Sequence, residues 1–229
     1  MSDDAALANL MARVKQLEDT LRRFQTFSAP ANGIPSGGAA GQVLGWSGTA
    51  GIAAWQNGGM TLIEGKNANA GAVASFDFQS IPTTYSKLVI DLYARGDTAA
   101  TSVATKIAFN ADASAIYDSL NWSVHHSASL ASSEYLAQTV GYPGSICAAS
   151  APASAFDLMR IEIPGYAITN GHKVWSSEAS AKTGITTGLI YDVHSKGWYR
   201  SANAIARVTL TPNAGNFAQY STARLYGVL

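Results

Sequence analysis

The sequence predicts a mainly β protein with an N-terminal helix that forms a trimeric coiled coil, a small β connector and a C-terminal antiparallel, jelly-roll-like β-sandwich. Three observations predict this organisation. Apolar residues near the N-terminus repeat every 3.5 residues, glycines and prolines interrupt the next segment, and strand-like alternation then continues to the C-terminus. The expected boundaries are 1–27 for the coiled coil, 28–59 for the connector and 60–229 for the head.

The N-terminal segment carries a heptad repeat. Its apolar residues are spaced alternately by three and four positions, which keeps one seam of a left-handed coiled coil facing its partners. Arg13 occupies a g position and Glu18 the following e position, so neighbouring helices can form an ion pair across the seam. The pattern resembles the trimerisation motif of short three-stranded coiled coils. The trimerisation residues are Leu7, Leu10, Arg13, Val14, Leu17, Glu18, Leu21 and Phe24.

A single amphipathic helix packed on its own domain is the other interpretation of residues 7–24. The apolar stripe is a narrow seam, whereas a helix on a globular core has a wider apolar face. A segment rich in glycine and proline follows directly and offers the helix no core of its own. Both points favour the coiled coil.

The connector contains a predicted β-hairpin. Two short apolar pieces, 41–46 and 52–55, flank a turn-forming Ser-Gly-Thr-Ala-Gly segment. An isolated hairpin is marginally stable at best, so we expect Trp46 and Trp55 to stack into a core shared by three chains. A flexible linker is the alternative, although two tryptophans so close together are unusual in a linker.

Residues 60–229 show the alternation of strands, separated by turn-forming segments at 94–97, 142–144, 169–171 and 212–215. About eight to ten strands without intervening helices indicate one all-β sandwich or barrel. The expected strands are 73–78, 87–93, 102–109, 156–163, 173–177, 189–193, 204–210 and 223–228.

The composition and the N-terminal residues argue against several classes of partner and against ordinary secretion. The 15 basic and 15 acidic residues balance, which argues against nucleic acid or an anionic membrane as a partner. No apolar run is long enough for a membrane span, and the acidic start does not resemble a signal peptide. Because only 13% of residues are charged, we expect the surface to pack against copies of itself or a larger assembly. The single cysteine, Cys147, excludes an intrachain disulfide and is expected to be a buried thiol.

The sequence predicts no enzyme, no cofactor and no metal site. Asp157 and Glu162 lie five residues apart on one expected strand, so they point to opposite faces and cannot form a glycosidase pair. No Gly-x-Ser-x-Gly motif is present. Adjacent His125 and His126 also face opposite sides of a strand, so one chain cannot offer both to one metal. Three copies of one of these histidines on a trimer axis remain an alternative.

Four residues are candidates for ligand binding: Trp122, His125, Trp198 and Tyr199. They lie in polar or glycine-bearing segments, where an aromatic ring suits stacking on the apolar side of a sugar. The alternative is that tryptophans such as Trp122, Trp175 and Trp198 belong to the core or an interface. The tripeptide 95–97, Arg-Gly-Asp, is interpreted as a turn at a strand end and not as an integrin motif.

Several segments resemble a domain that recurs in structural proteins of tailed bacteriophages. They are 78–88, 107–110, 161–166 and, most specifically, 215–221 with 225–228; the segment 41–55 is similar to a connector that precedes phage fibre tips. This resemblance implies a virion fibre or spike, in the head or tail, made in the host cytoplasm and exposed on the particle surface. It implies attachment to another virion protein by the N-terminus, a homotrimeric stalk and a C-terminal β-sandwich head.

Two functions follow from the resemblance. The head can bind the host surface, with cell-surface polysaccharide as the expected receptor. Alternatively, the protein is a decoration or connector of the head, collar or baseplate and has no receptor of its own.

Overall fold

The computed structural model describes residues 13–16, 42–46, 53–57, 59–125, 130–184 and 190–229. The chain divides into two compact units, Met1–Gly59 and Met60–Leu229.

In the first unit, residues 13–16 have helical backbone and exposed side chains, with Val14 48% exposed. The expected hairpin is present: β1 (Gln42–Trp46) pairs antiparallel with β2 (Ala53–Asn57). The expected stacking of the tryptophan side chains at 46 and 55 lies outside what the structure describes. So do the trimerisation residues other than Arg13 and Val14, namely Leu7, Leu10, Leu17, Glu18, Leu21 and Phe24.

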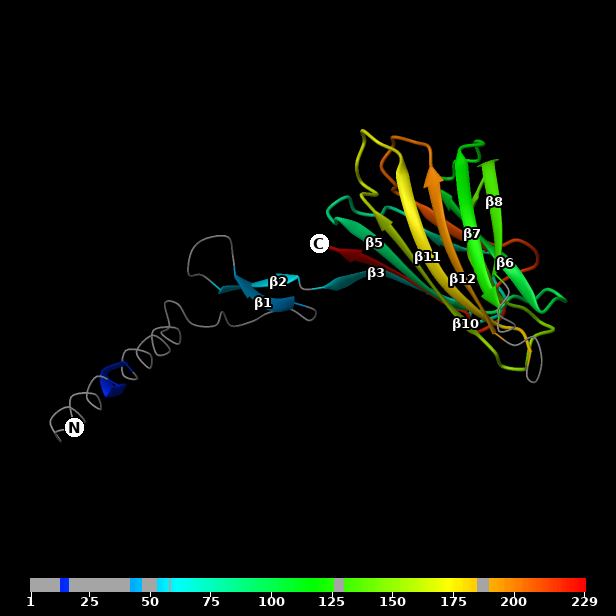
Figure 1. The fold of residues 1–229 in the computed structure, drawn as a ribbon, viewed down its shortest axis with the longest axis horizontal. Helices are drawn as coiled ribbons and strands as arrows, with labels where there is room; N and C mark the ends of the chain where they lie inside the picture. Colours follow the sequence, from blue (N-terminus) through cyan, green and yellow to red (C-terminus); the bar gives the residue numbers. More distant parts are fainter. Residues whose placement is uncertain (1–12, 17–41, 47–52, 58, 126–129, 185–189) are drawn as a thin grey trace. The chain divides into compact units, whose positions relative to one another are not determined.

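The second unit contains an antiparallel sheet of eight strands (Figure 1). Both of its edge strands, β3 and β8, are paired on one side only. In spatial order the strands are β3 (Met60–Asn67), β14 (Thr222–Val228), β5 (Lys87–Ala94), β10 (Asp157–Pro164), β11 (Lys173–Lys182), β12 (Ile190–Tyr199), β7 (Tyr117–His125) and β8 (Leu130–Gln138).

A second antiparallel sheet has four strands and packs against the first through β9, which contacts β10, β11, β12 and β7. The two sheets form the mainly β sandwich that the sequence predicts. In both sheets, strands that lie side by side are mostly distant from one another in the sequence. The strands are β4 (Phe76–Phe78), β13 (Val208–Pro212), β6 (Ser102–Phe109) and β9 (Gly141–Cys147).

Alternation along the strands separates core from surface. In β11 every second residue is buried, from Lys173 to Ala181, and the residues between them are exposed. The buried set faces the small sheet, whereas the exposed set lies on the opposite face of the large sheet, as in antiparallel sheets with one solvated face.

Four aromatic residues occupy the core beneath β11 and β12. The ring centroid of Phe109 lies 5.8 Å from that of Trp175 and 5.3 Å from that of Tyr199, and Tyr117 stacks on Tyr199 at 4.9 Å. The Trp175 indole fits because Gly197 has no side chain: a Cβ there would lie 1.8 Å from the indole Cζ2. Trp175 is therefore a core residue, as the alternative interpretation of the tryptophans predicts.

Cys147 is a buried thiol, as predicted, and burial raises its pKa to about 12. Asp157, 5% exposed, accepts hydrogen bonds from the backbone amides of Cys147 and Lys182. This carboxylate therefore joins the end of β9 to the end of β11.

Arg95 and Asp97 hold loops together, in agreement with the structural interpretation of residues 95–97. The Arg95 guanidinium donates hydrogen bonds of 2.7–3.1 Å to the carbonyls of four residues in the loop 149–155. Asp97 accepts hydrogen bonds from the backbone and side-chain amides of Asn216, at 2.7 and 2.9 Å.

Three expectations about strands are wrong in whole or in part. The segment 142–144, Tyr-Pro-Gly, lies inside β9 and is not a turn; β9 is an edge strand with a register shift opposite 105–107, and Gly144 has a φ of 138°. An edge strand with a bulge tolerates proline because no ladder hydrogen bond is lost. The expected strand 73–78 is reduced to three residues, and Val73 forms only an isolated bridge with Phe217. The expected strand 204–210 begins only at Val208.

Candidate functional site

The candidate site is on the face of the large sheet that the small sheet does not cover. Strand pairing places four side chains of this face in one row across β10, β11, β12 and β7. Arg160 lies opposite Glu178, Glu178 opposite His194, and His194 opposite Trp122. Since strands lie about 4.8 Å apart, the row spans about 14 Å.

A hollow of about 500 Å³ follows this row, and we call it the groove. Buried Ser177 and Ser195 form part of its floor, and their hydroxyls point towards the core. Ser177 donates a hydrogen bond to the carbonyl of Pro143, and Ser195 donates to Asn121 Oδ1 and to the carbonyl of Tyr142. The groove is lined by Trp122, Arg160, Glu162, Ser176, Ser177, Glu178, His194, Ser195 and Lys196.

Trp122 and His194 stack on each other in the groove. Their rings are nearly parallel, with an interplanar angle of 12° and a centroid separation of 5.8 Å. The His194 ring is held from the other side, because Nε2 lies 3.0 Å from Asp192 Oδ2. The Lys196 ammonium lies 6.0 Å from the centroid of the Trp122 ring, within the range of a cation–π contact.

Two charged residues at the far end of the groove are engaged with neighbouring strands. Arg160 forms a bidentate ion pair with Asp91, at 2.7 and 2.9 Å, and this hydrogen bond raises the Arg160 pKa. Glu162 accepts a hydrogen bond from Lys87 at 2.9 Å. These pairs lie on the sheet surface, so they fix side-chain positions more than they stabilise the fold.

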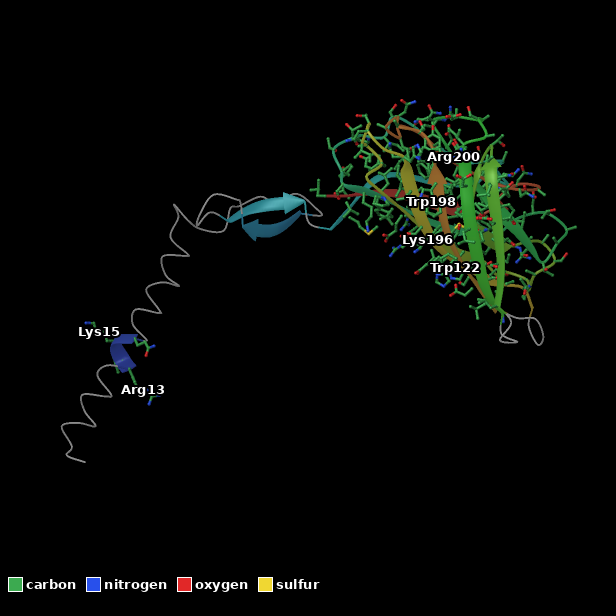
Figure 2. The ribbon with its side chains drawn as sticks, turned by 45° about the horizontal axis from the view of Figure 1, so that its top comes forward. Arg13, Lys15, Trp122, Lys196, Trp198 and Arg200 are labelled. Atoms are coloured by element: carbon green, nitrogen blue, oxygen red, sulfur yellow. The ribbon has the colours of Figure 1, made fainter. Side chains whose placement is uncertain are left out.

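A second hollow, of about 350 Å³, lies on the same face around Trp198, which is 43% exposed. Leu120 and Leu136 give this hollow an apolar wall, and Arg200 pairs with Asp118 at 3.1 Å. Figure 2 shows Trp122, Lys196, Trp198 and Arg200 following one another along the sheet. The two hollows therefore belong to one line of aromatic and cationic side chains.

The structure brings two of the four sequence-predicted binding residues to this face. Trp122 lines the groove and Trp198 lines the second hollow. The prediction for Tyr199 is wrong: it is 1% exposed, and its hydroxyl donates to Asp112 Oδ2 at 3.0 Å in the core. Successive residues of β12 face opposite sides, so Trp198 and Tyr199 cannot share a surface. The side chain of His125 lies outside the described residues, as does all of His126.

Sequence reasoning missed four residues of the groove: Arg160, Glu178, His194 and Lys196. Each lies on an outward position of its strand, so alternation identifies it as exposed. Only the strand order and register place the four side by side, and neither can be deduced from the sequence of one strand.

Among the described residues, the two acidic side chains considered from the sequence are separated by the sheet. Asp157 and Glu162 lie on opposite faces of β10, as predicted: the first is buried and the second lines the groove. No group of three or more metal-binding side chains is found within these residues. Nor do they contain a helix both long and apolar enough to cross a bilayer.

Comparison with known proteins adds little. No protein-family model and no curated protein matches the chain. Among solved structures, the chain is similar to exo-inulinase from Aspergillus awamori, with a TM-score of 0.33 and 10% sequence identity over 82% of this chain. The chain spans about a third of that protein's length (34%). Similarity at this level carries no argument about activity or ligand.

Proposed function

We propose that the protein is a homotrimeric virion fibre or spike subunit whose jelly-roll-like head binds saccharide on the host surface. The N-terminal coiled coil attaches it to another virion protein. The groove on the large sheet is the observation that carries the binding proposal, and the heptads and the phage-like segments support the fibre.

The groove has the chemistry that saccharides require. Trp122 offers an aromatic ring, held by stacking with His194, on which the apolar side of a pyranose can pack. Serine, glutamate and lysine side chains beside the rings can donate to or accept from hydroxyl groups. A shallow, open site of this kind suits a polymer that lies across the surface.

Trimerisation compensates for a shallow site. Three heads on one stalk place three grooves near the same polymer, so the apparent affinity rises without any new contact. The low charge of the sequence agrees with a chain that covers part of its surface with further copies.

The test is binding of the purified full-length chain and its variants to bacterial cells and to their extracted surface polysaccharides. Trp122→Ala should reduce binding roughly tenfold or more per site, because a stacked aromatic is lost. Tyr93→Ala is the matched control: Tyr93 is an exposed aromatic on the same sheet face, outside both hollows, and stacks on Phe156. Equal binding by both variants would show that the groove is not the site.

The alternative, a decoration or connector protein, is favoured by one observation. β8 is an open edge strand whose Leu130 and Leu136 are 73% and 57% exposed, and such edges invite pairing with another chain. If this role is the true one, deleting the head removes another protein from particles, and no polysaccharide binds.

A further inference from the structure

We propose that the saccharide is anionic and that Lys196 pairs with its carboxylate or phosphate group. This inference rests on the proposed saccharide-binding function and names the ligand class of the same groove. The polymer would lie along β12, with one sugar on Trp122 and a later one on Trp198.

The side chains that support this inference follow one another along the sheet. Lys196 and Trp198 occupy successive outward positions of β12, about 7 Å apart, and Trp122 lies on the adjacent strand. Trp198 is opposite Asp118, which is four residues from Trp122 on β7, so the two tryptophans are about 13 Å apart along the strands. Lys196 lies between them (Figure 2). A bound chain that contacts both rings must therefore pass the ammonium group.

The cations along this line differ in whether a carboxylate already binds them. The Arg160 guanidinium is occupied by both carboxylate oxygens of Asp91, and the Arg200 guanidinium is bound to Asp118 and to the carbonyl of Ala115. Within the described residues, the only contact of the Lys196 ammonium is with the Trp122 ring. Lys196 is therefore the cation that can accept an external anion without breaking an existing ion pair.

The carboxylates of this face would oppose an anionic ligand, and among the described residues Glu134, which lines the second hollow, has no ion pair and remains to oppose it there. Glu162 is neutralised by Lys87, and Asp118 by Arg200. Glu178 lies one strand beyond His194 and two strands from Trp122, with its carboxylate 3.9 Å from the His194 ring. It is thus placed to accept hydroxyl hydrogen bonds from a neighbouring sugar, away from the anion at Lys196.

The experiment uses the folded full-length chain against immobilised polymers. The probes are polygalacturonate, the same polymer after carboxyl reduction, a teichoic acid with sugar residues in its phosphate-linked backbone and neutral galactan. The variants are Lys196→Gln, Lys196→Arg and Lys106→Gln. Lys106 lies on β6 of the other sheet, so its substitution changes the net charge equally at a distance from the groove.

We expect the parent chain to bind one or both anionic polymers and to bind the reduced and neutral ones more weakly. Lys196→Gln should lower anionic binding about tenfold, whereas Lys196→Arg and Lys106→Gln retain it. Added salt should weaken the parent and leave Lys196→Gln little affected. Carboxyl reduction identifies a carboxylate ligand, and teichoic acid a phosphate.

Two results would overturn the inference. One is binding of neutral galactan as strong as that of either anionic polymer, with loss on Trp122→Ala; in that case the groove binds saccharide and only the anion is wrong. The other is anionic binding that falls equally for the Lys196→Gln and Lys106→Gln variants, which indicates non-specific charge attraction. If the chain binds no polymer in this panel or among extracted bacterial polysaccharides, the proposed function fails and the inference fails with it.

Discussion

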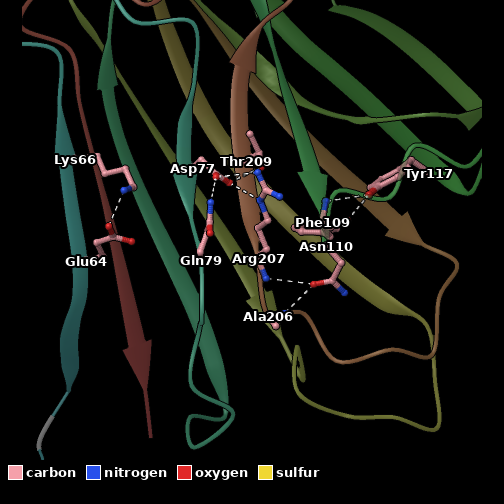
Figure 3. A network of polar contacts seen from close by, with 10 residues as sticks. All are labelled: Glu64, Lys66, Asp77, Gln79, Phe109, Asn110, Tyr117, Ala206, Arg207 and Thr209. Carbon is pink, nitrogen blue, oxygen red and sulfur yellow. Dashed lines mark hydrogen bonds and ion pairs between the residues drawn. The ribbon is translucent and has the colours of Figure 1, made fainter.

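Asp77 shows how one carboxylate joins two strands of the small sheet (Figure 3). It accepts hydrogen bonds from Arg207 Nε and Nη2, at 2.8 and 2.9 Å, and from Thr209 Oγ1 at 2.8 Å. These bonds, with the Arg207 contact as the largest cause, lower the pKa of Asp77 from 3.8 to about 2. The carboxylate thus ties β4 to β13, which otherwise share only three paired residues.

This pKa predicts a stability that depends on pH. Because the folded pKa is below the unfolded value, the contribution of Asp77 is complete above pH 3.8 and is lost as pH falls towards 2. Asp77→Asn should cost about 1–2 kcal/mol at pH 7, since solvent partly screens the group, and much less near pH 2. Urea unfolding at both pH values checks this.

Glu64→Gln is the control for Asp77. Glu64 lies on β3 and pairs with Lys66 at 2.6 Å, but its side chain is 38% exposed. An exposed pair contributes roughly 0–1 kcal/mol, so this variant should differ little from the parent at either pH. If Asp77→Asn is as mild as Glu64→Gln at pH 7, the Asp77 network does not stabilise the sandwich.

At the scale of the element, β12 combines the proposed binding surface with a tightly packed inner side. Gly197 lies between Lys196 and Trp198 in the sequence, and the Trp175 indole fills the space where its side chain would be. The indole is 2% exposed and contacts the aromatic core. The outward residues are therefore held on a strand that the core fixes in position.

Gly197→Ala should destabilise the head. The added Cβ would overlap the Trp175 ring at 1.8 Å, so either the indole or β12 must move, at a cost of about 3 kcal/mol or more. Gly65→Ala is the matched control, because a Cβ at Gly65 in β3 has no atom within 4 Å. Thermal unfolding of the two variants should differ by many degrees. Equal melting temperatures would mean that Trp175 can move aside without cost.

The sequence predicts strands well where one face is buried and poorly where none or both are. β5, β10 and β11 show clear burial differences between faces; β5 and β10 agree with their expected segments, and β11 begins where expected but continues to Lys182 instead of ending at 177. β8, in contrast, is exposed at almost every position and carries no alternating pattern to detect. β9 contains Pro143 and Gly144, which imitate a turn.

The candidate site was predictable only in part. Trp122 and Trp198 are recognisable as aromatics in polar segments, and the structure places both on one surface. Tyr199 is adjacent in sequence to Trp198 but faces the core, which follows from strand alternation once Trp198 is known to face outward. His194 and Lys196 depend on the pairing of β12 with β7 and β11, a long-range property.

At the scale of the whole molecule, the proposed assembly depends on the predicted heptad seam. Val14, at an a position, is 48% exposed in the single chain, as an apolar seam residue is when no partner covers it. The proposed trimer covers this seam and brings three heads together.

Leu17→Asp should convert the proposed trimer to monomers at micromolar concentration, because an unpaired charge would be buried in the seam. Lys15→Asp is the control: it also introduces an aspartate, but at an outward b position, and should remain trimeric. Sedimentation velocity of both variants distinguishes the states. A trimer in the Leu17→Asp variant would mean that the heads carry the association.

The alternation within β11 and β12 has a consequence for how the protein can change over time. Inward residues such as Trp175 and Tyr199 set the fold, whereas outward residues such as Glu178, Lys196 and Trp198 touch solvent. A substitution at an outward position leaves the core untouched. With the proposed binding function, the head can therefore acquire a new ligand preference by single mutations without first losing its structure, and a library randomised only at outward positions should yield folded proteins with many specificities.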